Sequence, residues 1–111
     1  MATKVLTVDA VMVDDTPTEI LTVPTAKDYN ISMIRFTNID TTDHQLTVWN
    51  YAPGSSESAD DTTAELFDMT IQPKQTFEFG PLLLPPGRVV SAQADAAGFI
   101  NARVHGWETD I

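Results

Sequence analysis

The strongest constraint on how this chain folds is the shortness of its apolar runs. About eight such runs fill most of the 111 residues, and turns rich in Pro, Gly or Asp-Thr separate them. None of the runs keeps a helical spacing of apolar residues for more than about two turns. Short strands with turn signals between them are typical of an all-β domain. We therefore predict a single antiparallel β-sandwich of jelly-roll type with about eight short strands.

The length and composition favour one domain that folds without covalent or metal staples. A chain of 111 residues buries roughly 65% of the surface that its unfolded form exposes. It contains no cysteine, so neither disulfides nor thiolate metal sites are available. No apolar run approaches the roughly 20 residues of a membrane span, and the first residues lack the apolar core of a signal peptide. We expect no membrane partner and folding in the cytoplasm.

The charge is strongly acidic and argues against nucleic-acid binding. The formal net charge is −10, from 16 acidic and 6 basic residues. The basic residues are scattered along the sequence: Lys4, Lys27, Arg35, Lys74, Arg88 and Arg103. Binding to a phosphate backbone needs a clustered positive patch, so we predict no direct contact with nucleic acid.

The turn signals divide the chain into strands and one long loop. The first predicted strand covers residues 5–13 and ends in an acidic turn that contains Pro17. Further strands are predicted at residues 20–23, 30–39, 45–51, 65–71, 76–79, 88–94 and 99–107. Residues 53–63 are polar and predict a loop that is solvated or orders on a partner. We divide the chain into an N-terminal strand or arm, residues 1–19, and a β-sandwich domain, residues 20–111.

Residues 45–51 alternate in polarity and give a strand with two distinct faces. Leu46 and Val48 lie on one face, whereas Trp49 and Tyr51 lie on the other. If the two aliphatic residues fill the core, the aromatic pair points outward and serves a subunit interface or a sugar-stacking platform. If the faces are reversed, the aromatic residues belong to the core. The pattern leaves these three interpretations open.

The strand at residues 30–39 is apolar on both faces. Met33 and Arg35 lie opposite to Ile34 and Phe36, as expected when one face is core and a neighbour covers the other. The apolar ridge of three leucines before the Pro-Gly turn is a second candidate contact surface. The predicted interface residues are Trp49, Tyr51, Met33, Arg35, Leu82, Leu83, Leu84, Val5 and Val8.

The residues that could bind metals form no recognisable ligand set. His44 and His105 are the only imidazoles, and without cysteine they would need carboxylates to complete a zinc site. We interpret both as ordinary surface or interface histidines. The acidic turns offer oxygen ligands for calcium but lack the spacing of a dedicated calcium loop, and Asp is common in turns because it bonds its own backbone. We predict no metal site and no cofactor.

The sequence also lacks the patterns of common catalytic sites. There is no Gly-x-Ser-x-Gly elbow and no glycine-rich phosphate loop. Glu65 and Glu78 fall on outward strand faces, where carboxylates are the default and nothing marks a glycosidase pair. We therefore predict that the protein is not an enzyme.

Five short turn-and-strand motifs follow one another along residues 20–108. They are TVPTAK at 22–27, IRFTN at 34–38, IQPKQT at 71–76, LLLPPG at 82–87 and AGFINARVHGWE at 97–108. Their order resembles that of a group of small bacteriophage virion structural proteins. The resemblance implies a β-sandwich located on the capsid exterior or in the tail, often assembled as a trimer.

This resemblance leads to a functional prediction. It implies a non-enzymatic capsid decoration (cement) protein, a homotrimer that binds the major capsid protein or another virion protein and stabilises the assembled shell by mass action. The protein would then be assembled in the host cytoplasm and reside in the virion. A tail or baseplate component and a carbohydrate-binding module for host recognition are the alternatives. Residues 1–19 lie outside the resemblance and are the candidate arm toward a neighbour, whereas the loop around Asp60 would face solvent.

Overall fold

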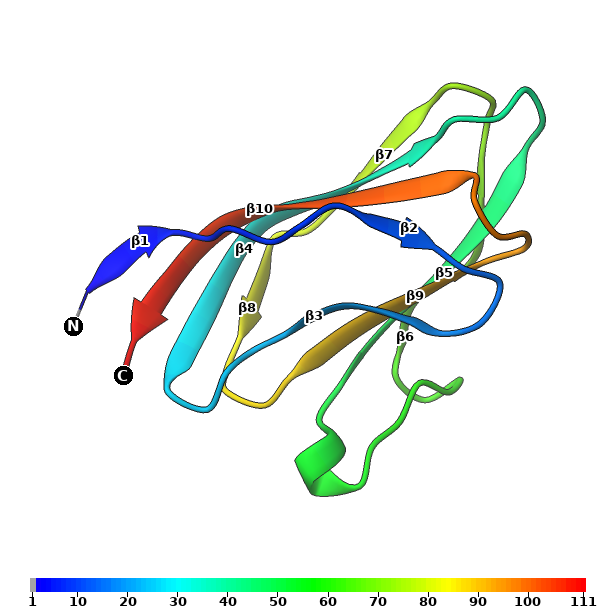
Figure 1. Cartoon of the computed structure of the whole chain (residues 1–111). Coiled ribbons are helices and arrows are strands. Elements are labelled where there is room, and N and C mark those ends of the chain that lie inside the picture. Colours follow the sequence, from blue (N-terminus) through cyan, green and yellow to red (C-terminus); the bar gives the residue numbers. More distant parts are fainter. Residues whose placement is uncertain (1) are drawn as a thin grey trace.

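The computed structural model describes residues 2–111 and consists of two antiparallel β-sheets packed face to face (Figure 1). The six-stranded sheet contains β1 (Thr3–Val5), β2 (Val11–Val13), β4 (Lys27–Asn38), β7 (Thr76–Phe79), β8 (Leu82–Leu84) and β10 (Ile100–Asp110). The four-stranded sheet contains β3 (Thr18–Thr22), β5 (His44–Tyr51), β6 (Ala64–Ile71) and β9 (Val89–Ala94). The predicted all-β sandwich is confirmed.

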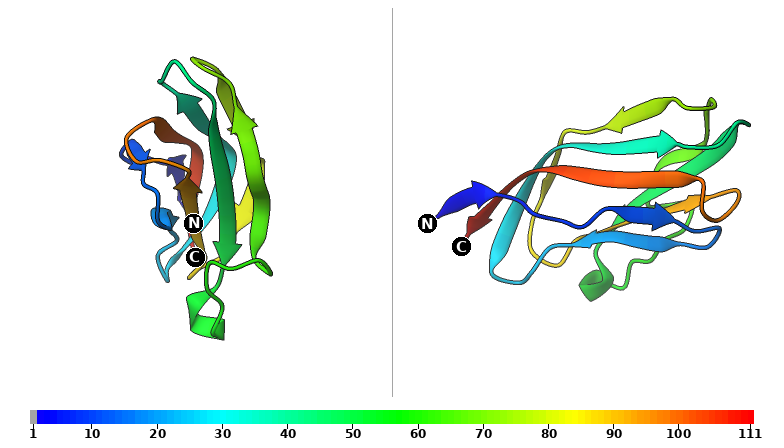
Figure 2. Two further views of the ribbon diagram at one scale, coloured as in Figure 1. Left: turned by 90° about the vertical axis from the view of Figure 1, so that its right-hand side faces the viewer. Right: turned by 45° about the horizontal axis from the view of Figure 1, so that its top comes forward.

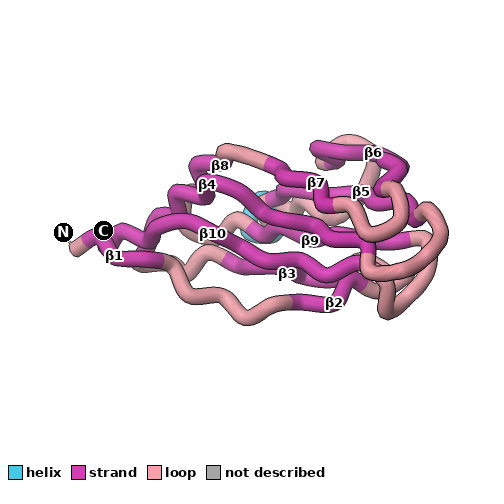
Figure 3. Tube along the Cα trace, turned by 90° about the horizontal axis from the view of Figure 1, so that it is seen from above, coloured by secondary structure: helices cyan, strands magenta, loops and turns pink. Residues whose placement is uncertain are grey.

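Two long strands organise the larger sheet. Its order is β1–β10–β4–β7, while β2 pairs with the other end of β10 and β8 with the other end of β4. The smaller sheet has the order β3–β9–β5–β6. Most connections cross from one sheet to the other, whereas the pairs β1/β2, β5/β6 and β7/β8 each stay within one sheet (Figures 2 and 3).

The predicted first strand, residues 5–13, is two strands in the structure. β1 and β2 both pair with β10, and the chain leaves the sheet between them. The gap lies beside a β-bulge, where Ser32 of β4 is an extra residue opposite His105 and Gly106 of β10. A bulge increases local twist and disrupts a continuous ladder. Because Leu82–Leu84 is also a strand, the described residues contain ten strands rather than about eight.

The core follows the period-two pattern of the sequence. Phe36, Leu46, Val48 and Ile100 are fully buried between the sheets. Alternate positions on β10 point outward, so Arg103 is exposed. Phe77 and Phe79 of β7 pack against the edge of this core.

The loop between β5 and β6 is exposed and internally hydrogen-bonded. It begins with a single 3-10 turn, η1 (Pro53–Ser55), which projects from one end of the molecule (Figure 1). The Glu57 carboxylate accepts a hydrogen bond from the Ala52 N–H at 2.7 Å and pairs with Arg88 at 3.1 Å. Hydrogen bonds from Thr62 lower the pKa of Asp60. The carboxylates of these residues therefore accept hydrogen bonds from donors in or beside the loop, as acidic side chains often do in turns.

The two ends of the described chain lie side by side at one end of the sheet (Figures 1 and 2). Lys27 of β4 lies 2.6 Å from Asp110 and 3.4 Å from Glu108 of β10, and Lys4 of β1 lies 3.5 Å from Glu108. The hydrogen bond with Lys27 lowers the pKa of Asp110 and raises that of Lys27. This cluster links β1, β4 and β10, so the predicted N-terminal arm begins on the chain's own sheet.

We expect Gly106→Ala to destabilise the protein by about 1–3 kcal/mol, the usual cost of overpacking. At the bulge, an added Cβ at Gly106 would overlap the Asn30 carbonyl oxygen and lie 2.9 Å from the Ile31 Cα. Gly54→Ala is the control, because nothing lies within 4 Å of a Cβ there. Urea unfolding measures both variants, and equal stabilities for the two would contradict the expected clash.

Candidate functional site

The outer face of the six-stranded sheet carries a row of exposed apolar side chains. Leu83 of β8 lies opposite Asn30 of β4, Asn30 opposite Trp107 of β10, and Trp107 opposite Val5 of β1. Residues directly opposite on antiparallel strands project from the same face. The exposed fractions are 78% for Leu83, 63% for Val5 and 49% for Trp107. We call Val5, Leu83 and Trp107 the apolar row, in which the polar Asn30 of β4 lies between Leu83 and Trp107, and the whole outer surface of this sheet the docking face.

Two arginines share the docking face with the apolar row. Arg35 of β4 lies directly opposite Arg103 of β10, and Glu78 of β7 pairs with Arg35 at 3.2 Å. No ion pair among residues 2–111 includes Arg103. Like charges directly opposite one another are destabilising. Arg103 therefore carries a positive charge that no ion pair among the described residues neutralises, and the only other unpaired charge named on this face is the carboxylate of Asp28 beside Asn30.

A shallow cavity of about 280 Å³ lies at the β8 end of the apolar row. It is lined by Asp28, Tyr29, Asn30, Leu83, Leu84, Pro85 and Thr109. Exposed apolar side chains beside a cavity are a common feature of protein contact surfaces. The docking face thus offers both protruding groups and a depression that a partner side chain can enter.

The structure brings together only part of the predicted interface set. Val5, Leu83, Met33 and Arg35 lie on the docking face, with Met33 half-buried opposite His105. Leu84 is only 2% exposed and belongs to the core, while Leu82 and Val8 pack against the core. Alternation along β8 explains the split, because only the middle of three consecutive residues points outward.

Trp107 belongs to the docking face but is absent from the predicted set. The signal was present in the sequence, because Trp107 continues the outward series of Arg103 and His105 at intervals of two residues. What the sequence did not supply was the alignment with Val5 and Leu83, which come from opposite ends of the chain.

Trp49 and Tyr51 lie on the other side of the sandwich, on the outer face of the four-stranded sheet. Leu46 and Val48 fill the core, so the interpretation in which the two faces of this strand are reversed is wrong. Trp49 is nevertheless only 6% exposed. Tyr51 is half-buried, and its hydroxyl lies 2.9 Å from that of Ser91. Neither aromatic ring stands freely in solvent.

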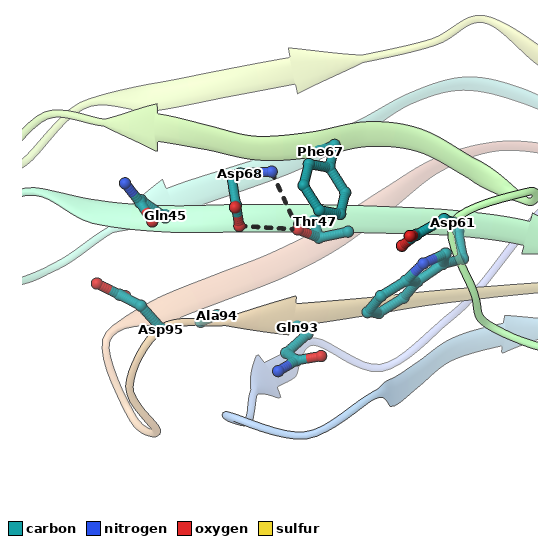
Figure 4. Close-up of a pocket in the computed structure, with 9 residues that line it drawn as sticks. Gln45, Thr47, Asp61, Phe67, Asp68, Gln93, Ala94 and Asp95 are labelled. Atoms are coloured by element: carbon teal, nitrogen blue, oxygen red, sulfur yellow. Dashed lines mark hydrogen bonds between the residues drawn. The ribbon is translucent and has the colours of Figure 1, made fainter.

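A second cavity, of about 320 Å³, adjoins Trp49 on this outer face (Figure 4). We call it the outer cavity. It is lined by Gln45, Thr47 and Trp49 of β5, Asp61 of the loop, Phe67 and Asp68 of β6, Gln93 and Ala94 of β9, and Asp95, which follows β9. The side chains are aromatic, amide and carboxylate, and no Lys or Arg is among them.

A bulge in β6 places two consecutive residues at the outer cavity. Phe67 and Asp68 together face the single residue Thr47, because the register shifts between Leu46 and Val48. Asp68 has a positive φ of 49°, and its N–H donates to the Thr47 hydroxyl at 3.1 Å, one of the bonds drawn in Figure 4. A regular strand would send one of the two side chains inward.

Phe67 and Asp68 were not among the residues predicted from the sequence to form a site. A usable signal was the spacing of Leu66 and Met69, since two partly buried residues three apart do not fit a strict period of two.

His44 is buried, which corrects its interpretation as a surface histidine. Nδ1 lies 2.7 Å from the Asp95 carboxylate and Nε2 lies 2.8 Å from that of Asp40, while the ring stacks on Phe99 at 4.7 Å. Both ring nitrogens donate only when the imidazole is protonated. The hydrogen bond with Asp40, followed by that with Asp95, raises the pKa of His44, and His44 lowers the pKa of Asp40 to about 2. His44 thus ties together the turns before β5 and after β9.

His105 is exposed on the docking face, so the two histidines lie on different sheets. In the part of the chain that the structure describes, no three His, Asp or Glu side chains are placed to hold a metal ion. Likewise, no helix within residues 2–111 has the length and hydropathy needed to cross a membrane.

Comparison with known proteins adds no relative. No protein-family model, no curated protein and no solved structure matches this chain.

We expect the stability contributed by His44 to depend on pH. Because its pKa is raised on folding, its stabilisation is complete below its ordinary value of 6.5 and is lost as the pH rises through the raised pKa. The lowered pKa of Asp40 acts oppositely, so its contribution is lost as the pH falls from 3.8 through about 2. The difference in Tm between the wild type and His44→Gln should be largest between these limits and shrink at alkaline pH. His105→Gln is the exposed control, and a pH-independent difference for His44→Gln would contradict the assigned protonation.

Proposed function

We propose that this protein is a non-enzymatic structural subunit of a bacteriophage particle, a decoration protein that binds the assembled shell through its docking face. The observation that carries the proposal is the apolar row, in which Val5 of β1, Trp107 of β10 and Leu83 of β8 lie exposed on one face of the sheet. The resemblance of residues 20–108 to small virion proteins supplies the identity of the particle.

The energetics of the apolar row favour a protein partner. Burying one Leu or Val side chain contributes roughly 1.5–3 kcal/mol, and soluble monomers rarely expose large contiguous apolar patches. A protein that binds only the assembled shell stabilises the shell by mass action. Since a shell presents many equivalent sites, a modest contribution per copy suffices to stabilise the whole particle.

The distribution of charge supports an oriented attachment. Arg35 and Arg103 lie on the docking face, whereas Asp61, Asp68 and Asp95 line the cavity on the opposite face. With a net charge of −10, copies of the chain repel one another unless their acidic faces are turned away from the contact. In this orientation the docking face contacts the shell and the acidic face and loop point to solvent.

The edge of the sheet supports assembly of several copies. Among the described residues, β10 is the only pairing partner of β1, so the other edge of β1 is open. An open strand edge is a template for pairing with another chain. We propose that residues 1–19 contact the neighbouring copy in a trimer. A tail or baseplate component would use the same face, and its absence from tailless heads distinguishes it from a decoration protein.

We expect the wild-type protein to bind purified shells, assembled from the capsid protein of the same genome, saturably and at a symmetry-related copy number. Leu83→Ser and Trp107→Ser should each weaken this binding by about tenfold or more, since a loss of about 1.4 kcal/mol suffices. Phe67→Ser is the matched control, because Phe67 is 63% exposed but lies on the other sheet. Co-sedimentation with shells measures all four proteins.

Sedimentation equilibrium of the protein alone tests the trimer separately. A protein that stays monomeric at high concentration, and that neither shells nor heads retain, would contradict the proposed role. Equal losses of binding for Leu83→Ser and Phe67→Ser would exclude the docking face as the contact.

A further inference from the structure

We propose that the outer cavity is a binding site for a neutral saccharide. The cavity lies on the face of the four-stranded sheet that looks away from the docking face, so a protein attached through the docking face leaves it accessible. The proposal does not depend on the shell as partner. It would give the protein a second binding activity, separate from any role in assembly.

The size and the aromatic side chains of the cavity suit a sugar ring. Its volume of about 320 Å³ lies at the lower end of the roughly 300–1,000 Å³ of small-molecule sites. Trp49 forms part of its wall at 6% exposure, and Phe67 stands at the rim at 63% exposure. A pyranose presents an apolar C–H surface on one side, which packs on aromatic rings as other apolar groups do. An exposed Phe on a strand, next to a buried Trp, provides such a surface.

The polar groups of the cavity are mostly hydrogen-bond acceptors. Asp61, Asp68 and Asp95 supply carboxylate oxygens, and Gln45 supplies an amide. Some of these groups already have hydrogen-bond partners, since Asp95 Oδ1 is hydrogen-bonded to the His44 ring and the Gln93 amide donates to the Asp15 carbonyl. The remaining carboxylate oxygens call for a ligand with several donors, and sugar hydroxyls bound to carboxylates form strong, charge-assisted bonds.

An unsatisfied donor indicates that the ligand must also accept hydrogen bonds. The indole Nε1–H of Trp49 is buried and has no partner among the described residues. Leaving a buried donor unpaired is costly, so each such group in a native protein needs an explanation. A hydroxyl is both donor and acceptor. A ligand with several hydroxyls can therefore donate to the carboxylates and, once side-chain movement on binding opens a path to the buried indole edge, accept from it.

The charge of the cavity selects among ligand classes. Without a Lys or Arg in its wall, and with three carboxylates, it repels phosphates and acidic sugars. A cationic ligand would be attracted by the carboxylates and by the face of Trp49. However, an ammonium group has no acceptor for the indole N–H, so it leaves that donor unsatisfied. A neutral saccharide satisfies the aromatic, acceptor and donor groups together.

The test is binding of intact protein to a panel of neutral oligosaccharides, covering hexoses, deoxyhexoses and N-acetylhexosamines, with calorimetry on the compounds that bind. We expect binding that Phe67→Ala weakens about tenfold through loss of the stacking surface. Trp49→Phe keeps an aromatic ring but removes the N–H, and it should weaken binding by a smaller factor of about three to ten. Leu83→Ser is the matched control, since Leu83 is 78% exposed but lies on the docking face. It should bind sugar like the wild type.

A spectroscopic measurement locates the ligand independently of affinity. In a Trp107→Phe background Trp49 is the only remaining tryptophan, so saccharide binding should change its emission. Acidic glycans and a polyamine serve as probes for the competing ligand classes. The proposal is overturned if folded protein binds no neutral saccharide of the panel, if the acidic glycan or the polyamine binds instead, or if Phe67→Ala binds as the wild type does. None of these results bears on docking, which the Leu83 and Trp107 variants test on shells.

Discussion

The antiparallel ladder between β4 and β10 is the interaction on which the rest of this structure depends. The two strands pair through 11 residues of β10, and every other strand of the larger sheet is attached to one of them. β10 holds β1 and β2, and β4 holds β7 and β8. The inward side chains of the ladder, such as Phe36 and Ile100, form the core, and the outward ones form the docking face. One ladder therefore sets both the stability of the sandwich and its main contact surface.

Two of the bulges in the sheets re-aim side chains at the two outer faces. In β4 the extra residue Ser32 allows Ile31 and Ile34, three residues apart, to be buried together, and its hydroxyl donates to the His105 carbonyl at 2.9 Å. In β6 the extra residue brings both Phe67 and Asp68 to the outer cavity. Bulges re-aim side chains in this way near functional sites in many sheets. Here each one departs from strict alternation beside a proposed binding surface.

The two outer faces differ in chemistry as well as in shape. The docking face combines apolar side chains with the uncompensated charge of Arg103, whereas the outer cavity combines aromatic rings with carboxylates. The first suits a protein surface and the second a small polar ligand. Because the core separates the two faces, a substitution on one face makes no direct contact with the other. A particle that displays many copies would also bind a surface polysaccharide with high avidity, even if each cavity binds weakly.

The sequence by itself determined the all-β class, the approximate strands and which residues of a strand share a face, because alternation along a strand is a local property that short apolar runs reveal. Leu46 and Val48 were placed on one face and Trp49 and Tyr51 on the other for this reason, and the packing of the two sheets decided that the aliphatic face is the core. Tertiary structure alone decided which outward residues stay exposed. Trp49 is buried beside residues of β6 and the preceding loop, while Leu83 and Trp107 remain open because none of residues 2–111 covers them. The burial of His44 between Asp40 and Asp95, and the alignment of Val5 with Trp107, likewise depend on pairings between distant segments, which no local pattern encodes.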